Sequence, residues 1–200
     1  GVIISGDNNI IEQNTFTDNG VSIQFVSTSE DSRANNNEIT DGTTTAIALT
    51  GAEETIIRDN YIHNNSGYGI NVTDGASDNI IYNNNLEYNS EYSFYVLESG
   101  NNSIHNNTFK SNDDGPAKFE SSYYNIFRDN NLDANDDYLH IEGGGQNSIL
   151  NNTFIENGIL IQNANNQIIM SNTITEAPDN GIKIFKASSN NYLSDNSISN

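Results

Sequence analysis

The chain has 200 residues, a formal net charge of -20 at pH 7 and a sequence pI near 4.1. Such an acidic surface repels phosphate backbones, which argues against a nucleic acid partner. Cysteine is absent, which excludes disulfides and thiol chemistry, and no apolar run approaches the ~20 residues of a membrane span.

One six-residue pattern, apolar-x-x-Asn-x-apolar, recurs along the whole chain. It occupies residues 11–16 and returns at residues 57–62, 104–109 and 149–154, with degenerate copies between them. A fixed period of this kind is the signature of a solenoid, in which each repeat forms one coil. The central asparagines recur every 20 to 24 residues: Asn14, Asn37, Asn60, Asn84, Asn107, Asn130, Asn152, Asn172 and Asn196.

Each repeat has room for three short strands. An apolar residue stands two positions after the central asparagine, and a pair of apolar residues two apart follows, for example at residues 47–49, 94–96 and 182–184. Alternation over so few residues indicates strands with one buried face. We therefore expect an all-β fold: a right-handed, single-stranded parallel β-helix of about nine coils, each of about 23 residues with three short strands. Stacking at the ~4.8 Å strand spacing gives a rod roughly 40 Å long.

Two other repeat architectures fit less well. Leucine-rich repeats need several leucines at fixed offsets, and this chain has few. Calcium-binding nonapeptide repeats need a Gly-Gly-x-Gly-x-Asp frame, which only residues 143–145 approach.

Asparagine suits both the turns and the stacking of such a coil. It tolerates the left-handed backbone conformation, so we expect these asparagines to form the turns. Its amide can also donate to one neighbouring coil and accept from the other, which satisfies groups that are costly to bury unpaired. We expect one ladder from the nine central asparagines and a second from those five residues further on: Asn19, Asn65, Asn89, Asn112, Asn135 and Asn157.

A binding or catalytic site would lie on the outward positions of the paired strands. Tyr95, Lys118 and His140 stand there on successive coils, with Glu120 and Glu142 in the next outward column. Tyrosine, lysine and histidine could supply the base, acid and cation that polysaccharide lyases and epimerases need. These three are therefore candidate catalytic residues, and all five are candidate carbohydrate-binding residues. The alternative is an ordinary surface ion pair, worth ~0–1 kcal/mol.

Two acidic pairs are candidate calcium ligands. Asp113-Asp114 and Asp136-Asp137 occupy the same offset on successive coils, so we expect them to lie about one strand spacing apart. Like charges so close repel unless a cation lies between them, and Ca²⁺ takes six to eight oxygen ligands. Calcium is therefore the candidate cofactor, and a solvated acidic turn is the alternative.

Two further surface features could engage glycans. A column of Arg58, Tyr82, His105 and Arg128 forms a basic and aromatic strip, although four unlike residues are also compatible with plain surface. An exposed secreted rod would present its Asn-x-Ser/Thr motifs for N-glycosylation. These motifs begin at Asn64, Asn71, Asn101, Asn106 and Asn151.

Residues 79–86, Asn-Ile-Ile-Tyr-Asn-Asn-Asn-Leu, and residues 67–72, Gly-Tyr-Gly-Ile-Asn-Val, are typical of the repeats. They resemble the pectin-lyase-like right-handed β-helix superfamily, especially the repeats of NosD-like proteins and archaeal surface proteins. The resemblance covers the whole chain and implies the fold, but the superfamily includes lyases, hydrolases, epimerases, adhesins and inert stalks. Its Asp-Pro-His, Gly-His-Gly, Arg-Ile-Lys and Arg-x-Pro-x-x-Arg enzyme signatures do not occur here. The resemblance therefore favours a role other than catalysis.

We expect residues 1–200 to form a single β-helix domain, an extracellular structural or adhesive module at the cell surface or in a filament. A carbohydrate-binding or polysaccharide-cleaving β-helix is the alternative function. Solenoids normally close with polar caps, whereas residues 1–4 resemble the opening of a coil and residues 195–198 its late part. We therefore expect a fragment or repeating unit of a longer protein, partnered by neighbouring domains or by copies stacked head to tail.

Overall fold

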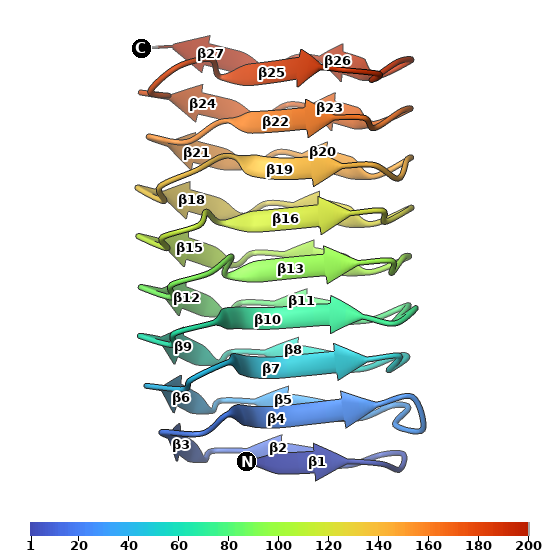
Figure 1. Cartoon of the computed structure of the whole chain (residues 1–200), viewed down its shortest axis with the longest axis vertical. Coiled ribbons are helices and arrows are strands. Elements are labelled where there is room, and N and C mark those ends of the chain that lie inside the picture. Colours follow the sequence, from blue (N-terminus) through green and yellow to red (C-terminus); the bar gives the residue numbers. More distant parts are fainter. Residues whose placement is uncertain (200) are drawn as a thin grey trace.

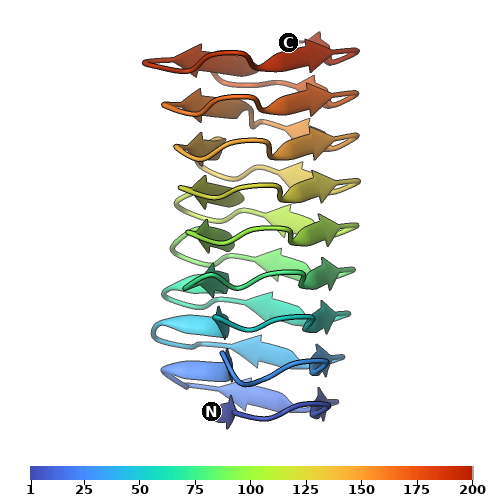
Figure 2. The ribbon, with the colours of Figure 1, turned by 90° about the vertical axis from the view of Figure 1, so that its right-hand side faces the viewer.

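The computed structural model describes residues 1–199, which form a rod of nine coils containing only strands and turns. Each coil contributes one strand to each of three parallel sheets, and the sheets run the full length of the rod (Figures 1 and 2). The predicted parallel β-helix, with three short strands in each of about nine coils, is confirmed. In the described range there is no helix that could span a membrane.

The three sheets are defined by their strands. The first sheet contains β1 (Val2–Ile4), β4 (Val21–Val26), β7 (Thr45–Thr50), β10 (Tyr68–Thr73), β13 (Phe94–Leu97), β16 (Ala117–Glu120), β19 (Leu139–Glu142), β22 (Ile159–Gln162) and β25 (Ile182–Phe185). The second contains β2 (Ile10–Glu12), β5 (Arg33–Asn35), β8 (Ile56–Arg58), β11 (Ile80–Tyr82), β14 (Ser103–His105), β17 (Ile126–Arg128), β20 (Ser148–Leu150), β23 (Ile168–Met170) and β26 (Tyr192–Ser194). The third contains β3 (Thr15–Thr17), β6 (Glu38–Thr40), β9 (Tyr61–His63), β12 (Asn85–Glu87), β15 (Thr108–Lys110), β18 (Asn131–Asp133), β21 (Thr153–Ile155), β24 (Thr173–Thr175) and β27 (Ser197–Ser199).

The core is a stack of apolar side chains that point inward from all three sheets. In β13, Phe94 and Val96 are buried while Tyr95 and Leu97 are only half-buried, as alternation along a strand requires. The Phe119 ring contacts Phe94 from its own sheet and Phe127 from the second sheet, with centroids 6.2 and 5.9 Å away. Removing each such ring from water stabilises the fold by about 1.5–3 kcal/mol.

The central asparagines form the predicted ladder along the rod. Asn84 Nδ2 donates to Asn107 Oδ1 at 3.0 Å, and Asn107 Nδ2 donates to Asn130 Oδ1 at 3.1 Å. Each amide also bonds main-chain groups, as when Asn107 Nδ2 donates to the Ile81 carbonyl at 3.0 Å. The same side-chain contact joins Asn14 to Asn37 and continues to Asn196. The ladder therefore satisfies buried polar groups in every coil.

The left-handed turns lie one residue before the ladder, not on it as the sequence reasoning expected. Residues such as Asp59, Asn106 and Ser171 adopt φ between 56° and 59°, whereas no central asparagine has a positive φ. The turn position accepts Gln, Asn, Asp or Ser, so its residue type carries a weaker signal. The asparagine stands next to it because its short side-chain amide can both donate and accept along the rod.

Two further ladders accompany the first. The second runs from Asn65 to Asn157 as predicted, but Asn19 is not joined to it because Gly42 stands in the intervening coil. A third ladder, which the sequence reasoning missed, lies five residues before the central asparagines. It links Asn79, Asn102, Asn125 and Asn147 through their side chains and continues through Gln167 to Asn191.

Variation in coil length is concentrated in the turn that leads from the third sheet to the first. This turn separates Lys110 from Ala117 in one coil, but only Ile155 from Ile159 two coils later. The turn from the first sheet to the second has the same length in neighbouring coils. It runs from Glu142 to Ser148 in one coil and from Gln162 to Ile168 in the next. The ladders therefore stay in register while this one turn changes.

Candidate functional site

The outward column predicted on the first sheet is present. Tyr95 pairs with Lys118, and Lys118 with His140, as neighbours on β13, β16 and β19. Glu120 and Glu142 are likewise paired, two residues further along their strands. All five side chains project from the outer face because their neighbours along each strand point into the core. The strands therefore bring together every residue of the predicted carbohydrate-binding set.

A continuous polar network links Tyr95, Lys118, Glu120 and Glu142, whereas the Nε2 atom of His140 is not bonded to it. Lys118 Nζ lies 2.8 Å from Glu120 Oε2 and 3.0 Å from Glu142 Oε2. The Tyr95 hydroxyl donates to Glu120 Oε2 at 2.8 Å. At the other end, Gln162 Nε2 donates to Glu142 Oε1 at 2.9 Å. The network thus spans four coils and fixes the orientation of each side chain.

The network sets the charges of its members at neutral pH. Burial lowers the pKa of Lys118, but its hydrogen bonds to Glu120 and Glu142 outweigh that effect and hold the pKa above its ordinary value. Burial and then the hydrogen bond to Glu120 raise the pKa of Tyr95. The hydrogen bond from Lys118 outweighs burial and lowers the pKa of Glu120. Lys118 is therefore a cation, Tyr95 a neutral phenol and Glu120 an anion, so neither Lys118 nor Tyr95 can act as a base.

His140 differs from its neighbours in the column. Burial, and then the nearby charge of Lys118, lower the pKa of His140, so the imidazole is neutral at pH 7. Its Nε2 atom is buried and has no hydrogen-bond partner. His140 is the only predicted catalytic candidate that can accept a proton at neutral pH, but a substrate cannot reach Nε2 in this arrangement.

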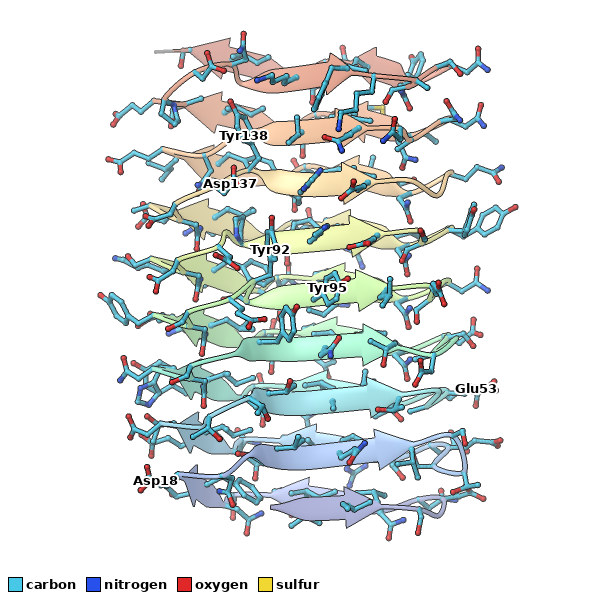
Figure 3. All side chains as sticks on the ribbon, viewed as in Figure 1. Asp18, Glu53, Tyr92, Tyr95, Asp137 and Tyr138 are labelled. Atoms are coloured by element: carbon cyan, nitrogen blue, oxygen red, sulfur yellow. The ribbon has the colours of Figure 1, made fainter. Side chains whose placement is uncertain are left out.

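Three tyrosines that the sequence reasoning did not single out extend this face. The Tyr68 ring stacks on Tyr95 with centroids 5.0 Å apart and an interplanar angle of 14°. Tyr92 and Tyr138 lie beside the column at the turns that enter the first sheet, as Figure 3 shows for Tyr92, Tyr95 and Tyr138. Burial raises the pKa of both Tyr68 and Tyr92 to about 12. The sequence signal for these residues is a tyrosine that stands just before a first-sheet strand or at its start.

The two aspartate pairs lie at exposed turns on successive coils. The amides of Asp113 and Asp136 donate to the Asn89 and Asn112 carbonyls in the preceding coils, at 3.0 and 3.1 Å. Within residues 1–199, no three or more His, Asp or Glu side chains converge closely enough to hold a metal ion. Calcium binding by Asp113, Asp114, Asp136 and Asp137 stays a prediction.

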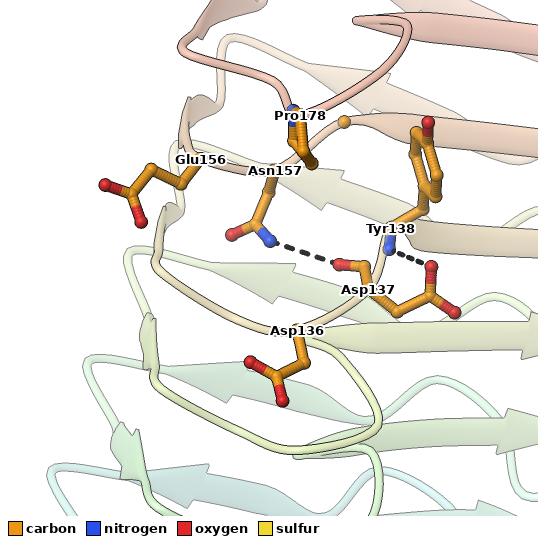
Figure 4. A pocket seen from close by; sticks show the side chains of 7 residues that line it. Asp136, Asp137, Tyr138, Glu156, Asn157 and Pro178 are labelled. Atoms are coloured by element: carbon orange, nitrogen blue, oxygen red, sulfur yellow. Dashed lines mark hydrogen bonds between the residues drawn. The ribbon is translucent and has the colours of Figure 1, made fainter.

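A small pocket lies beside the second aspartate pair (Figure 4). Its volume is about 30 Å³, enough for an ordered water, which needs ~10–15 Å³. Asp137 Oδ1 accepts the Tyr138 amide at 2.7 Å, and the Asp137 carbonyl accepts Asn157 Nδ2 at 3.1 Å. Pro178 and Glu156 complete the wall. The pocket is too small for a sugar ring.

Four of the five N-glycosylation motifs begin at exposed left-handed turn residues. Asn64, Asn101, Asn106 and Asn151 all project from turns, with φ between 54° and 58°. Asn71 instead lies in β10, where it is half-buried and its Oδ1 atom has no hydrogen-bond partner. Glycosylation stays a prediction, for which the four turn positions are the more accessible acceptors.

The sequence matches the family described as the right handed beta helix region, over residues 1–132 and again over residues 76–198. The chain belongs to this family. The match confirms the predicted superfamily and the right-handed coil. No curated protein sequence matches the chain.

Three solved structures share the fold. The A-module of mannuronan C-5 epimerase AlgE6 from Azotobacter vinelandii gives a TM-score of 0.80 at 12% identity, over 96% of this chain and 58% of that one. DFA-IIIase from Arthrobacter chlorophenolicus A6 gives 0.64 at 15%, over 95% and 53%. Alginate lyase from Paenibacillus sp. str. FPU-7 gives 0.63 at 14%, over 99% and 87%. This chain therefore spans a little over half the length of the first two, and such low identities establish the fold alone.

Proposed function

We propose that this β-helix is an adhesive module at the cell surface that binds carbohydrate on the outer face of its first sheet. The observation that carries the proposal is the stack of Tyr68 on Tyr95, at 5.0 Å, beside the network around Lys118. A flat aromatic surface next to fixed polar groups is what a sugar requires, since one face of the ring is apolar and its edge carries hydroxyls. Three similarly folded proteins with names that denote action on saccharides support the same ligand class.

The charges on this face favour a neutral glycan over a uronate polymer. The positive charge of Lys118 is already shared between Glu120 and Glu142. Glu91 and Asp114 lie close enough to raise the pKa of Tyr68, and Asp137 acts similarly on Tyr92. A carboxylate-bearing polymer would meet net negative charge here, whereas sugar hydroxyls can donate to these carboxylates.

The protonation and burial of the candidate catalytic residues support carbohydrate binding better than carbohydrate cleavage. Lys118 and Tyr95 remain protonated, and the Nε2 atom of His140 is buried. A lyase or epimerase needs a base that reaches the substrate, and no member of this column meets that need in the observed arrangement. The polysaccharide-cleaving alternative therefore requires the side chains to rearrange when a ligand binds.

The test is calorimetric titration of the purified chain with a series of neutral and uronate oligosaccharides. We expect binding to neutral oligosaccharides, weakened about tenfold or more by Tyr95→Ala, because that change removes the stacking surface (~1.4 kcal/mol per tenfold). Tyr61→Ala is the matched control, since Tyr61 is 38% exposed on the third sheet and takes no part in this face.

Two outcomes would refute the proposal. One is the absence of any oligosaccharide binding at millimolar concentration. The other is equal affinity of the Tyr95→Ala and Tyr61→Ala variants. Cleavage or epimerisation of a polysaccharide that Lys118→Ala abolishes would instead establish the enzymatic alternative.

A further inference from the structure

The outer face of the second sheet is apolar in the C-terminal part of a strongly acidic protein. Ile80, Ile126 and Ile168 are 40, 40 and 39% exposed in β11, β17 and β23. Tyr123 and Tyr124, in the turn before β17, are 50 and 54% exposed. An extended exposed apolar surface of this kind marks an interaction site rather than ordinary surface.

This face also carries less negative charge than the N-terminal part of the same sheet. In its six coils, the segments from the end of each first-sheet strand to the central asparagine contain five acidic residues in a chain with 27: Asp74, Asp78, Glu98, Asp129 and Asp195. Asp129 is itself bound to Arg128 and Asn151. The corresponding part of the first three coils contains seven: Asp7, Glu12, Glu30, Asp31, Glu53, Glu54 and Asp59.

The exposed side chains alternate in size along the rod. Strand register places Ile80, Ser103, Ile126, Ser148, Ile168 and Tyr192 in one column. From Ile80 to Ile168 a large side chain recurs every second coil, or about 9.6 Å at the ~4.8 Å strand spacing, and the alternation ends there because Tyr192 follows Ile168 on the next coil. Ser103 and Ser148 lie between the isoleucines and are small, so each leaves a gap. The isoleucines of a second copy, shifted by one coil, can fill these gaps.

We propose that this face binds a second copy of the chain, with the two rods antiparallel. A twofold axis perpendicular to the rods, between β17 and β20, would set Ile126 against Ser148 of the partner subunit and Ile168 against Ser103 of the partner subunit. At each end of the contact it would set Tyr192 against Ile80 of the partner subunit, two apolar side chains in contact. Such an interface is isologous and closes at two copies. The acidic N-terminal coils of the two rods then point away from each other, which removes most of the repulsion between two chains of net charge -20.

A dimer of two parallel rods fits worse, both in charge and in shape. A twofold axis along the rod would place each coil against the same coil of its partner, so the acidic N-terminal coils would face one another. It would also set the isoleucine column against the column that contains Tyr82 and Arg128 instead of against the serine gaps. Charge and shape therefore select the same arrangement.

The available area is sufficient for a moderate interface. Six coils at ~4.8 Å, with about six residues of each coil at ~3.3 Å, give a footprint of roughly 600 Å² per partner. The total of about 1,200 Å² lies at the lower end of the range for specific protein–protein interfaces. A reversible dimer is therefore expected rather than an obligate one.

The primary test is sedimentation equilibrium of the purified chain. We expect the mass to rise with concentration from the 22.0 kDa of one chain to twice that value and no further. Added salt should strengthen the dimer, because it screens the like charges but not the apolar contact. Ile168→Lys should weaken dimerisation about tenfold or more, since it places a charge in the apolar column (~1.4 kcal/mol per tenfold).

Thr173→Lys is the matched control. Thr173 is exposed in β24 of the same coil but on the third sheet, and its substitution changes the net charge equally. Because both variants make the chain less acidic, weaker association of Ile168→Lys alone cannot come from net charge. An unchanged melting temperature and circular dichroism spectrum of Ile168→Lys establish that the fold is intact.

Cross-linking tests the orientation, since a chain without cysteine permits single-cysteine variants. A short bismaleimide should link Ser148→Cys to its partner copy but not Arg33→Cys, which lies in the N-terminal part of the same sheet. A chain that stays monomeric at millimolar concentration would overturn the proposal, as would an open-ended polymer. Efficient linking of Arg33→Cys would overturn the antiparallel arrangement.

Discussion

Replacing Asn107 by alanine tests whether the asparagine ladder stabilises the rod. Asn107 Oδ1 accepts the Asn84 main-chain amide at 2.9 Å and Asn84 Nδ2 at 3.0 Å. Its own Nδ2 donates to the Ile81 carbonyl at 3.0 Å and to Asn130 Oδ1 at 3.1 Å. Asn130 Oδ1 keeps a second donor, the main-chain amide of residue 107. Alanine therefore deprives chiefly one buried group, the Asn84 amide, since Ile81 keeps its place in the pairing of β11 with β14.

The expected cost follows from that count. A buried polar group left without a partner costs about 1–3 kcal/mol, so we expect the unfolding free energy to fall by about that amount. Asn131→Ala is the control, because Asn131 is exposed on β18 and its replacement should change stability by less than about 0.5 kcal/mol.

Urea denaturation followed by circular dichroism measures the overall loss, and amide hydrogen exchange locates it. The Asn84 amide should exchange about 30-fold faster or more in Asn107→Ala, the equivalent of about 2 kcal/mol. A total loss below about 1 kcal/mol, or an unchanged exchange rate at Asn84, would show that the ladder is not a major source of stability.

Three further predictions concern the core, the histidine and calcium. Phe119→Ala should cost about 3–5 kcal/mol in urea denaturation, because the ring is 1% exposed and contacts Phe127; a loss under about 1 kcal/mol would contradict the packing. The folded-state pKa of His140 lies below its unfolded value of 6.5, so its stabilising effect is present above pH 6.5 and is lost as the pH falls below it. His140→Gln should therefore lose less stability than the parent chain between pH 7 and pH 5, and identical pH profiles would exclude this effect. Calcium binding at the aspartate pairs predicts a melting temperature that rises with Ca²⁺ and rises less in Asp137→Asn, whereas no response to Ca²⁺ or chelator would rule it out.

The repeat pattern was sufficient to predict the fold, because burial alternates along each strand and a regular period fixes the register between coils. Ile47 aligns with Ile70, and Tyr95 with Lys118, as the spacing of the asparagines predicted. The third ladder was missed because its members follow turns of mixed composition, such as Tyr124 before Asn125. The left-handed turns were assigned to the wrong residue because asparagine suits two positions. It tolerates a left-handed backbone and it also bonds between coils, and its presence in the sequence does not show which of the two it does.

The candidate site was predicted less completely. Register alone placed Tyr95, Lys118 and Glu120 side by side, but their protonation states depend on distances that a sequence pattern does not contain. The stack of Tyr68 on Tyr95 was not predictable for the same reason, since Tyr68 belongs to another column of the sheet. The apolar column of the second sheet was visible as isoleucines at the first position of alternate strands, but its significance depends on the measured exposure.

The turn between the third and first sheets can change in length while the paired strands on both sides of it stay the same. It borders the tyrosine-rich face, and its first residues hold the second ladder, as at Asn112 and Asn135, while the number of residues after them varies. Segments inserted after the ladder asparagines would lengthen the rim of this face and leave strand pairing and the ladder in place, but they would disturb main-chain bonds between the turns, such as that from the Asp136 amide to the Asn112 carbonyl. The same rod can therefore acquire new recognition loops by insertion at one edge, and directed libraries in this protein are best placed at residues 113–116 and 136–138, which leaves Asn112 and Asn135 unchanged.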